Sequence, residues 1–470
     1  MNRERKHTCV SFLFGKRKAG IELRSPDKEV TVSKFKVELI DLLDKNQNKI
    51  YSSDGGEYAR AGIDGVTFWA ERTIGVPARF AIQVLTATWI RFFVAHRIDE
   101  IRMAWNRDLP SNLWVKPFDP MFTEMWPAHH RVEVTVPNVR DRQYSWLLPT
   151  PAFEHNINLF LPDIKTVGTA YVEATKETVL DQLQLIPDDE TIAVSLSGGT
   201  DSSGVLAVLL HCIRELGRTN RVYCLTLAID GGGSDLDQAR QVVKTLTPKF
   251  GGQFEHHIIK VDSGEIDRDK LRRRSSTTTE DYRILDLESA MACTLLFDAA
   301  SREEKLGNLP PLRFEFNGDG GNEIFLDYPL TGRGHRPIPM EDVWRNPHLF
   351  LLGYGKSSLT NPVYSAGLSR GYTRTFCPAR EHDVMSFSPL IDRRVIEVGT
   401  KIPLRNLAPT EDELHKLRGL AVQAGVLTLT GVKIPVCPKT MFQDGASSKP
   451  GLIRVSEEES LALKATILRG

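Results

Sequence analysis

The stretch Ser197-Gly198-Gly199-Thr200-Asp201-Ser202-Ser203 decides the fold of this chain of 470 residues. An apolar, β-branched run at 191–196 precedes it and is typical of a buried strand. The apolar pattern that follows is helical and ends at Gly217. A strand, a Ser/Gly turn and a helix N-terminus present backbone N–H groups to an anion, and the glycines let a phosphate approach closely. This first turn, 197–203, therefore predicts a nucleotide site in which Asp201 holds a magnesium ion.

Strand and helix patterns alternate on both sides of the first turn. Further strands are predicted at 221–229, 256–261 and 313–316, and helices at 170–184, 238–247 and 285–301. Such alternation predicts an α/β fold with a parallel sheet and helices on both of its faces.

The two ends of the chain differ from this central pattern. Beyond about residue 332 the chain is predicted to be mostly helical. Residues 1–165 are predicted to form a smaller α+β domain, with strands at 29–35 and 131–136 and a helix at 78–97.

Composition argues against several classes of protein. Lys plus Arg and Asp plus Glu both number 60, so the formal net charge is zero, unlike that of a protein built to coat nucleic acid. The six cysteines form no CxxC pair, which gives zinc or iron–sulfur ligation little support and fits a reducing cytoplasm. The longest apolar stretch, 80–94, contains Gln83 and Arg91 and is too short to cross a bilayer. The N-terminus lacks the apolar core of a signal peptide.

A second glycine-rich turn, which is also acidic, follows the strand pattern at 313–316. It reads Asn317-Gly318-Asp319-Gly320-Gly321-Asn322-Glu323-Ile324-Phe325. In a parallel sheet this second turn, 317–325, lies at the carboxyl end of its strand, where ligands bind. Alone it would be a surface turn without a metal. Beside the first turn it predicts a second wall of the nucleotide site, because magnesium favours one or two carboxylates together with substrate phosphates.

Together the two turns resemble the synthetase domain of the asparagine synthetase family. These are PP-loop ATP pyrophosphatases, and their relatives include β-lactam synthetases and lasso-peptide macrolactam cyclases. Weaker matches follow in the family's order: Ser234-Asp235-Leu236, then Ser388-Pro389-Leu390-Ile391-Asp392 with Lys401-Ile402-Pro403, then Lys439-Thr440-Met441-Phe442-Gln443-Asp444-Gly445. The resemblance implies a degenerate or replaced amidotransferase-like domain at 1–165, an ATP-binding synthetase domain at 166–450 and a C-terminal tail at 451–470.

The resemblance implies an enzyme, an ATP-dependent carbon–nitrogen ligase that uses ATP and Mg²⁺. A substrate carboxylate would be adenylated with release of pyrophosphate, and an amine or ammonia would then displace AMP. Lys439, Asp201 and Glu323 would be catalytic, with Lys439 a point charge over the pyrophosphate and the developing oxyanion. The alternative to a catalytic role is that Lys439 is an exposed loop lysine without a function in the site. The metal would be held by Asp201, Asn322 and Asp319. The residues that would bind ATP are Ser195, Ser197, Gly198, Gly199, Thr200, Asp201, Ser202, Ser203, Gly318, Asp319 and Gly320.

Three positions depart from the family's pattern. Residue 2 is Asn where glutamine-dependent members have a cysteine, so the amine would come from solution or from the substrate. Asn322 stands where the family has a magnesium-binding Asp, which removes one negative charge. Either Asp319, Glu323 or Asp327 would compensate, or the metal would bind more weakly. Leu326-Asp327 replaces a Gly-Gly pair before Tyr328, which predicts an acceptor other than aspartate.

Three functions stay open at this point. The first is a cytoplasmic amide, lactam or macrolactam synthetase that joins the carboxylate of a small molecule or peptide to an amine. It would bind neither a membrane nor nucleic acid, and it would act as a homodimer or with a pathway partner protein. The second is a PP-loop enzyme that modifies tRNA, which would need catalytic cysteines or a basic surface. The third is a non-catalytic nucleotide-binding homologue. The basic run Lys270–Arg274 is predicted to be a solvated, mobile loop rather than a nucleic-acid patch.

Overall fold

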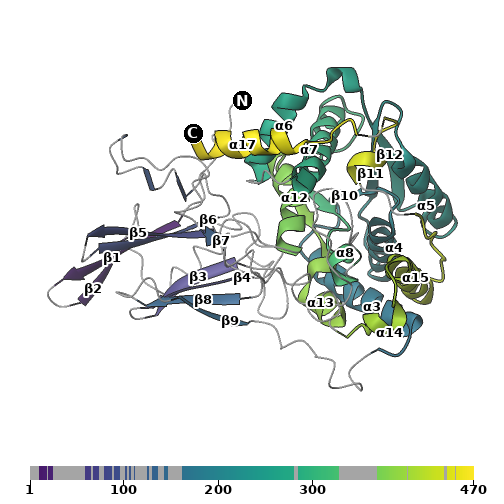
Figure 1. Cartoon of the computed structure of the whole chain (residues 1–470). Coiled ribbons are helices and arrows are strands. Elements are labelled where there is room, and N and C mark those ends of the chain that lie inside the picture. Colours follow the sequence, from purple (N-terminus) through teal and green to yellow (C-terminus); the bar gives the residue numbers. More distant parts are fainter. Residues whose placement is uncertain are drawn as a thin grey trace. The chain divides into compact units, whose positions relative to one another are not determined.

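The chain forms two compact units in a computed structural model (Figure 1). The first comprises Met1–Thr150, Leu352–Ser369 and Ala462–Gly470, and the second Pro151–Leu351 and Arg370–Leu461. The residues described are 161–279, 284–325, 327, 368–399, 401–438, 442–449 and 451–469, together with strands and short turns between 10 and 146.

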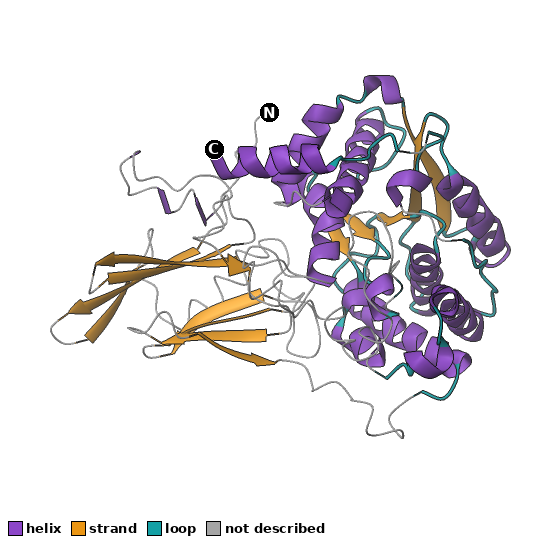
Figure 2. Ribbon diagram, in the orientation of Figure 1, coloured by secondary structure: helices purple, strands orange, loops and turns teal. Residues whose placement is uncertain are grey.

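In the first unit the described residues are mainly strands of two antiparallel sheets (Figure 2). Phe68 and Phe92 stack across the two sheets with ring centroids 4.3 Å apart. One sheet has the order β2-β1-β6-β5-β7, with β1 Val10–Arg17, β2 Gly20–Arg24, β5 Arg79–Thr86, β6 Trp89–Ala95 and β7 Glu124–Met125. The other has the order β3-β4-β8-β9, with β3 Ala59–Asp64, β4 Thr67–Arg72, β8 His130–Thr135 and β9 Arg142–Trp146.

The helix predicted at 78–97 is wrong, because these residues form the hairpin of β5 and β6. The apolar residues alternate with a period of two, and the hairpin register pairs Phe80 with Val94 and Ile82 with Phe92. The strand predicted at 131–136 is confirmed by β8. The strand predicted at 29–35 lies outside the described residues.

The second unit contains a five-stranded sheet in which every pairing is parallel, which confirms the predicted α/β fold. Its order is β12-β11-β10-β13-β14. The strands are β10 Ile192–Ser195, β11 Val222–Ile229, β12 Phe254–Val261, β13 Phe314–Phe316 and β14 Met385–Phe387. All but β14 coincide with the predicted strands.

Helices cover both faces of this sheet. Helix α7 lies on one face, and α4 and α5 lie on the other (Figure 1). The helices are α3 Ile164–Leu183, α4 Thr200–Glu215, α5 Ser234–Phe250, α6 Arg268–Thr279, α7 Ile284–Lys305, α8 Gly321–Ile324, α12 Leu368–Glu381, α13 Arg393–Gly399, α14 Leu404–Leu407, α15 Glu411–Thr430, α16 Phe442–Gly445 and α17 Glu457–Arg469, with short 3₁₀ turns η3 Ser263–Glu265 and η4 Pro389–Ile391.

The chain reverses its winding between β10 and β13, which are neighbours in the sheet. From β10 it winds through β11 to β12 on one side, and it then returns to β13 on the other. In open parallel sheets the crevice at such a reversal, beyond the carboxyl ends of the strands, is where ligands bind. Both glycine-rich turns begin at this point.

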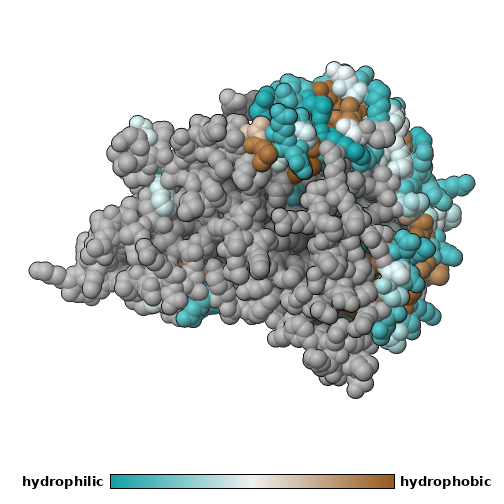
Figure 3. All heavy atoms as spheres, viewed as in Figure 1, coloured by the Kyte–Doolittle hydropathy of each residue, from teal (hydrophilic) through white to brown (hydrophobic). Residues whose placement is uncertain are grey.

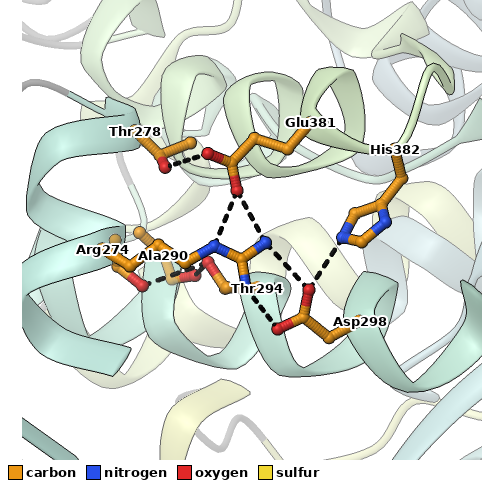
Figure 4. Close-up of polar contacts among 8 residues, drawn as sticks. Arg274, Thr278, Ala290, Thr294, Asp298, Glu381 and His382 are labelled. Carbon is orange, nitrogen blue, oxygen red and sulfur yellow. Dashed lines mark hydrogen bonds and ion pairs between the residues drawn. The ribbon is translucent and has the colours of Figure 1, made fainter. Parts of the chain in front are cut away.

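Helix α6 occupies the basic run for which a mobile loop was predicted, so that prediction is wrong. The residues that form its buried side are Leu271, Ser275, Ser276, Thr278 and Thr279. Arg274 makes ion pairs with Asp298 of α7, Nη1–Oδ2 2.6 Å, and with Glu381 of α12, Nη2–Oε2 2.8 Å (Figure 4). These contacts anchor the run as a helix, whereas its charge alone suggested a solvated segment.

No helix among the described residues is both long enough and apolar enough to cross a membrane. On the face drawn in Figure 3, apolar residues of the described surface form small groups among hydrophilic ones.

Candidate nucleotide site

The first turn is fixed from within by its own hydroxyl groups. Ser195 ends β10, and Gly199 precedes α4. The hydroxyls of Ser202 and Ser203 donate to the carbonyl of Gly199 at 3.2 and 2.7 Å, and the N–H of Gly199 donates to the hydroxyl of Ser197 at 3.3 Å. The turn is therefore held by its own hydrogen bonds, with the positive end of the α4 dipole directed at it.

Gly198 shows why this turn needs a glycine. Its φ is +78°, in the left-handed region. A Cβ there would lie 2.2 Å from the backbone nitrogen of Ala239 in α5. No other residue fits at this position without moving α5 away from the turn.

The second turn is held by a buried polar network. Asn317 donates to Glu315 at 3.2 Å and to Ser386 of β14 at 2.9 Å, and the hydroxyl of Ser386 donates to Glu315 at 2.7 Å. The amide oxygen of Asn317 accepts from the backbone N–H of Asp319 at 3.0 Å and from the hydroxyl of Ser388. The network thereby fixes the start of the second turn.

The two turns are in direct contact. A Cβ on Gly318 would lie 2.6 Å from the backbone nitrogen of Ser202, and one on Gly321 would lie 2.2 Å from Oδ1 of Asp201. Real Cβ atoms do not come so close, so only glycine lets the backbone of the second turn lie against Asp201. The structure thus brings together Asp201 and the second turn, as the sequence predicted.

Burial perturbs the carboxyl groups of this region. It raises the pKa of Asp319 to about 6, against the opposing effects of the Arg374 charge and a hydrogen bond from Thr375. Burial also raises the pKa of Glu315 to about 7, against hydrogen bonds from Ser386 and Asn317. Glu323 is buried as well. Perturbed acids that gather at one end of a sheet are typical of functional sites.

Arg418 of α15 is a central residue of this site that the sequence reasoning missed. Its Nη1 donates to Oδ2 of Asp201 at 2.6 Å and also to Oδ1 of Asn322, and its Nη2 lies 2.8 Å from Oδ2 of Asp327. The side chain is buried. Burial lowers the pKa of Arg418, but the charges of Asp201 and Asp327 outweigh this effect and raise it above its usual value.

A signal for Arg418 exists in the sequence. It lies on one face of α15 with Leu414, Leu417, Ala421 and Val422, all of which are buried. A lone arginine on an otherwise apolar helix face needs an acidic partner, because a buried charge is costly unless it is paired.

The predicted magnesium ligands do not fit a bare ion as they stand. Arg418 donates to Oδ2 of Asp201 and to Oδ1 of Asn322, so a cationic group already lies between these two side chains, while Oδ2 of Asp319 is buried without a hydrogen-bond partner among the described residues. In the described part of the chain, no three or more His, Cys, Asp or Glu side chains cluster as metal ligands. The assignment of Asp201, Asn322 and Asp319 to magnesium stays a prediction.

Lys439 lies outside the described residues, but the described segments that flank it contact the first turns of α5. The carbonyl of Pro438 accepts from the side chain of Gln238 at 3.2 Å, and Gln238 also abuts Gly198. On the other side, a Cβ on Gly445 would lie 1.9 Å from Oδ1 of Asp235. The Ser234-Asp235-Leu236 element and the segment that ends at Gly445 are therefore neighbours in space.

Residues 173–386 match the family model described as asparagine synthase. No curated protein matches the chain significantly. A similar solved structure is the U34-tRNA thiolase NcsA from Methanococcus maripaludis with its [4Fe-4S] cluster, at 15% identity over 64% of this chain and 78% of that chain, with a TM-score of 0.26. A similarity at that level carries no argument about function. The matched segment includes both glycine-rich turns and most of the parallel sheet, and the match supports membership of the asparagine synthetase family for residues 173–386.

Proposed function

We propose that the protein is an ATP-dependent carbon–nitrogen ligase that releases AMP and pyrophosphate. Enzymes of this family are ATP-dependent ligases and typically use ATP with Mg²⁺. The observation that carries the proposal is the contact of the two turns, in which Gly318 and Gly321 leave room for no side chain against Asp201. This packing places an anion-binding helix N-terminus and a buried acidic turn at one point of the sheet.

In the first step, a carboxylate oxygen of the substrate attacks the α-phosphorus of ATP. The bond between the α-phosphorus and the bridging oxygen breaks, and pyrophosphate leaves. The first turn, with Ser195 at its start, binds the departing phosphates through backbone N–H groups and hydroxyls. Lys439 balances their charge. Gly318, Asp319 and Gly320 line the other side.

In the second step, an amine attacks the carbonyl carbon of the acyl-adenylate. The carbon–oxygen bond to AMP breaks, and the amine nitrogen loses a proton. Glu323 is a candidate for the group that accepts this proton. The acceptor is an amine of the same substrate, which gives a lactam or macrolactam, or ammonia from solution. The carboxylate belongs to a small molecule or a peptide. The protein works in the cytoplasm, as a homodimer or with a pathway partner protein.

The proposal is tested with purified protein, ATP and a panel of amino acids and peptides. We expect AMP and pyrophosphate in equal amounts, and a hydroxamate when hydroxylamine traps the activated carboxylate. ADP with inorganic phosphate would contradict the proposal. Turnover that requires tRNA would favour a tRNA-modifying enzyme, and ATP binding without AMP would favour a non-catalytic homologue.

A glycine variant links the activity to this site. Gly321→Ala places a methyl group on the Asp201 carboxylate, so the turns must separate. Displacements of about 1 Å in an active site can cost about 100-fold in rate, and we expect a loss of pyrophosphate release of that order. Gly252→Ala is the matched control, because a Cβ at Gly252 meets no atom within 4 Å. Equal rates for both variants would remove the two turns from the active site.

A further inference from the structure

We propose that Arg418 is a built-in cation that occupies, at Asp201 and Asn322, the position expected for a metal ion. In this role Arg418 is a positioning residue, which joins the two turns before any nucleotide binds. The nucleotide-free protein is then expected to bind divalent ions only weakly at this point.

The contacts of Arg418 join three separate positions of the chain. Its Nη1 donates to Asp201 at the start of α4 and to Asn322 in α8, and its Nη2 pairs with Asp327 just after α8. A guanidinium has five donors in a rigid planar fork, so it can bridge several acceptors as a metal ion does. The more compact ammonium of a lysine does not reproduce this geometry.

Arg418 balances one of the two negative charges that it contacts. Asp201 and Asp327 carry the acidic groups in contact with Arg418, and Asn322 contributes a neutral oxygen. An acidic residue at 322 would add a third negative charge, which would favour a divalent ion. The departure of Asn322 from the family's pattern therefore has a physical counterpart in Arg418.

The packing of α15 fixes the position of Arg418. A Cβ on Gly204 of α4 would lie 2.8 Å from Val422, and one on Gly168 of α3 would lie 2.0 Å from the carbonyl oxygen of Ala421. Both contacts lie within one turn of Arg418 on the same helix. The guanidinium is consequently held by backbone packing as well as by its ion pairs.

A buried phenol beside the cluster adds a second observation. Tyr171 of α3 is 2% exposed, and within the described ranges its hydroxyl has no hydrogen-bond partner. Burial, with the charge of Asp201 as a smaller contribution, raises the pKa of Tyr171 well above 10, while the charge of Arg418 lowers it. Arg418 and Asp327 are themselves buried, so water screens their ion pair little, which strengthens it.

The test is a titration of the nucleotide-free full-length protein with Mn²⁺, followed by electron paramagnetic resonance. We expect weak binding by the wild type. Arg418→Met keeps an apolar stem and frees the carboxylates of Asp201 and Asp327, so affinity for Mn²⁺ should rise by about tenfold or more. Arg418→Lys, which keeps the charge, should gain less. Adding Asp201→Asn to Arg418→Met should abolish the gain.

Arg393→Met is the matched control, because Arg393 pairs with Glu397 on α13 and its side chain is 43% exposed. It should leave Mn²⁺ binding unchanged. A folded Arg418→Met protein without the gain would overturn the proposal. If Arg418→Met fails to fold, Mn²⁺ binding by the wild type is compared with binding by Asp201→Asn. Tight binding by the wild type that Asp201→Asn removes would show a vacant ion site and overturn the proposal. No turnover is measured, so the result is independent of the proposed ligase activity.

Discussion

Asp235 is a carboxyl group at the start of α5 that is almost completely removed from water. It is 3% exposed, and its Oδ2 has no hydrogen-bond partner among the residues that the structure describes. Gly445 closes directly on its other oxygen. Burial alone raises the pKa of Asp235 to about 8 from an ordinary value of 3.8.

This pKa predicts that Asp235→Asn stabilises the protein as the pH rises. Between about pH 4 and pH 8 the folded protein keeps a proton that the unfolded chain loses, so the contribution of Asp235 to the free energy of unfolding falls with rising pH. The fall is at most about 1.4 kcal/mol per pH unit. The stability difference between the variant and the wild type should grow up to about pH 8 and then stay constant, as measured by urea unfolding. Asp237→Asn, on an exposed position of the same helix turn, should show no such trend. A difference independent of pH would exclude a buried neutral Asp235.

At the scale of elements, the crossing of α3 and α15 depends on small residues. A Cβ on Gly425 would lie 2.1 Å from the carbonyl oxygen of Gly168 and 2.5 Å from Val172. Because α15 carries Arg418, this crossing also sets where the guanidinium meets Asp201.

We therefore expect Gly425→Ala to destabilise the protein and to lower its activity. Overpacking costs about 1–3 kcal/mol, which exceeds the roughly 1 kcal/mol that alanine gains over glycine in a helix. Urea unfolding measures the change, and pyrophosphate release reports the displacement of Arg418. Gly252→Ala again provides the control. A stabilised Gly425→Ala protein would show that the two helices are less closely packed than described.

A second element-scale prediction concerns the ion pairs that join α6, α7 and α12 (Figure 4). Arg274 pairs with Asp298 and Glu381, and Asp298 also contacts His382 at 2.8 Å. A double-mutant cycle with Arg274→Gln and Asp298→Asn should give a coupling free energy of about 0.5–3 kcal/mol, because the two groups share one network. The same cycle on the exposed pair of Arg240 and Asp237 should give about 0.5 kcal/mol or less. Equal values in the two cycles would contradict the structure.

At the scale of the whole molecule, the thiols of the second unit differ in their environment. Cys212, Cys224 and Cys293 are buried, and Cys377 and Cys437 are partly exposed. Burial raises the pKa of Cys212 and of Cys293 to about 12, which leaves almost no reactive thiolate near neutral pH. Iodoacetamide should modify Cys377 and Cys437 in the native protein and the buried three only after unfolding, as peptide mass spectrometry can show. Rapid labelling of Cys224 in the native protein would contradict this packing.

The parallel sheet and both turns could be predicted because their signals are local. Each central strand is an apolar run, and each turn carries its own glycines. Contacts between distant segments gave no such signal. Strand β14 has three residues and a polar centre, Ser386, whose partner Glu315 lies 71 residues earlier. The apolar helix face around Arg418 indicates a buried arginine, but its acidic partners could not be identified because they come from turns far back in the chain.

The ion pair of Arg418 with Asp201 also sets an order of events during synthesis of the protein. The two residues are 217 positions apart, so at 5–20 residues per second the ribosome adds Arg418 roughly 10 to 40 s after Asp201. During that interval the nascent first turn exists without the cation that pairs with it. The candidate nucleotide site can therefore be completed only late in translation, after α15, which follows all five strands of the parallel sheet, has emerged.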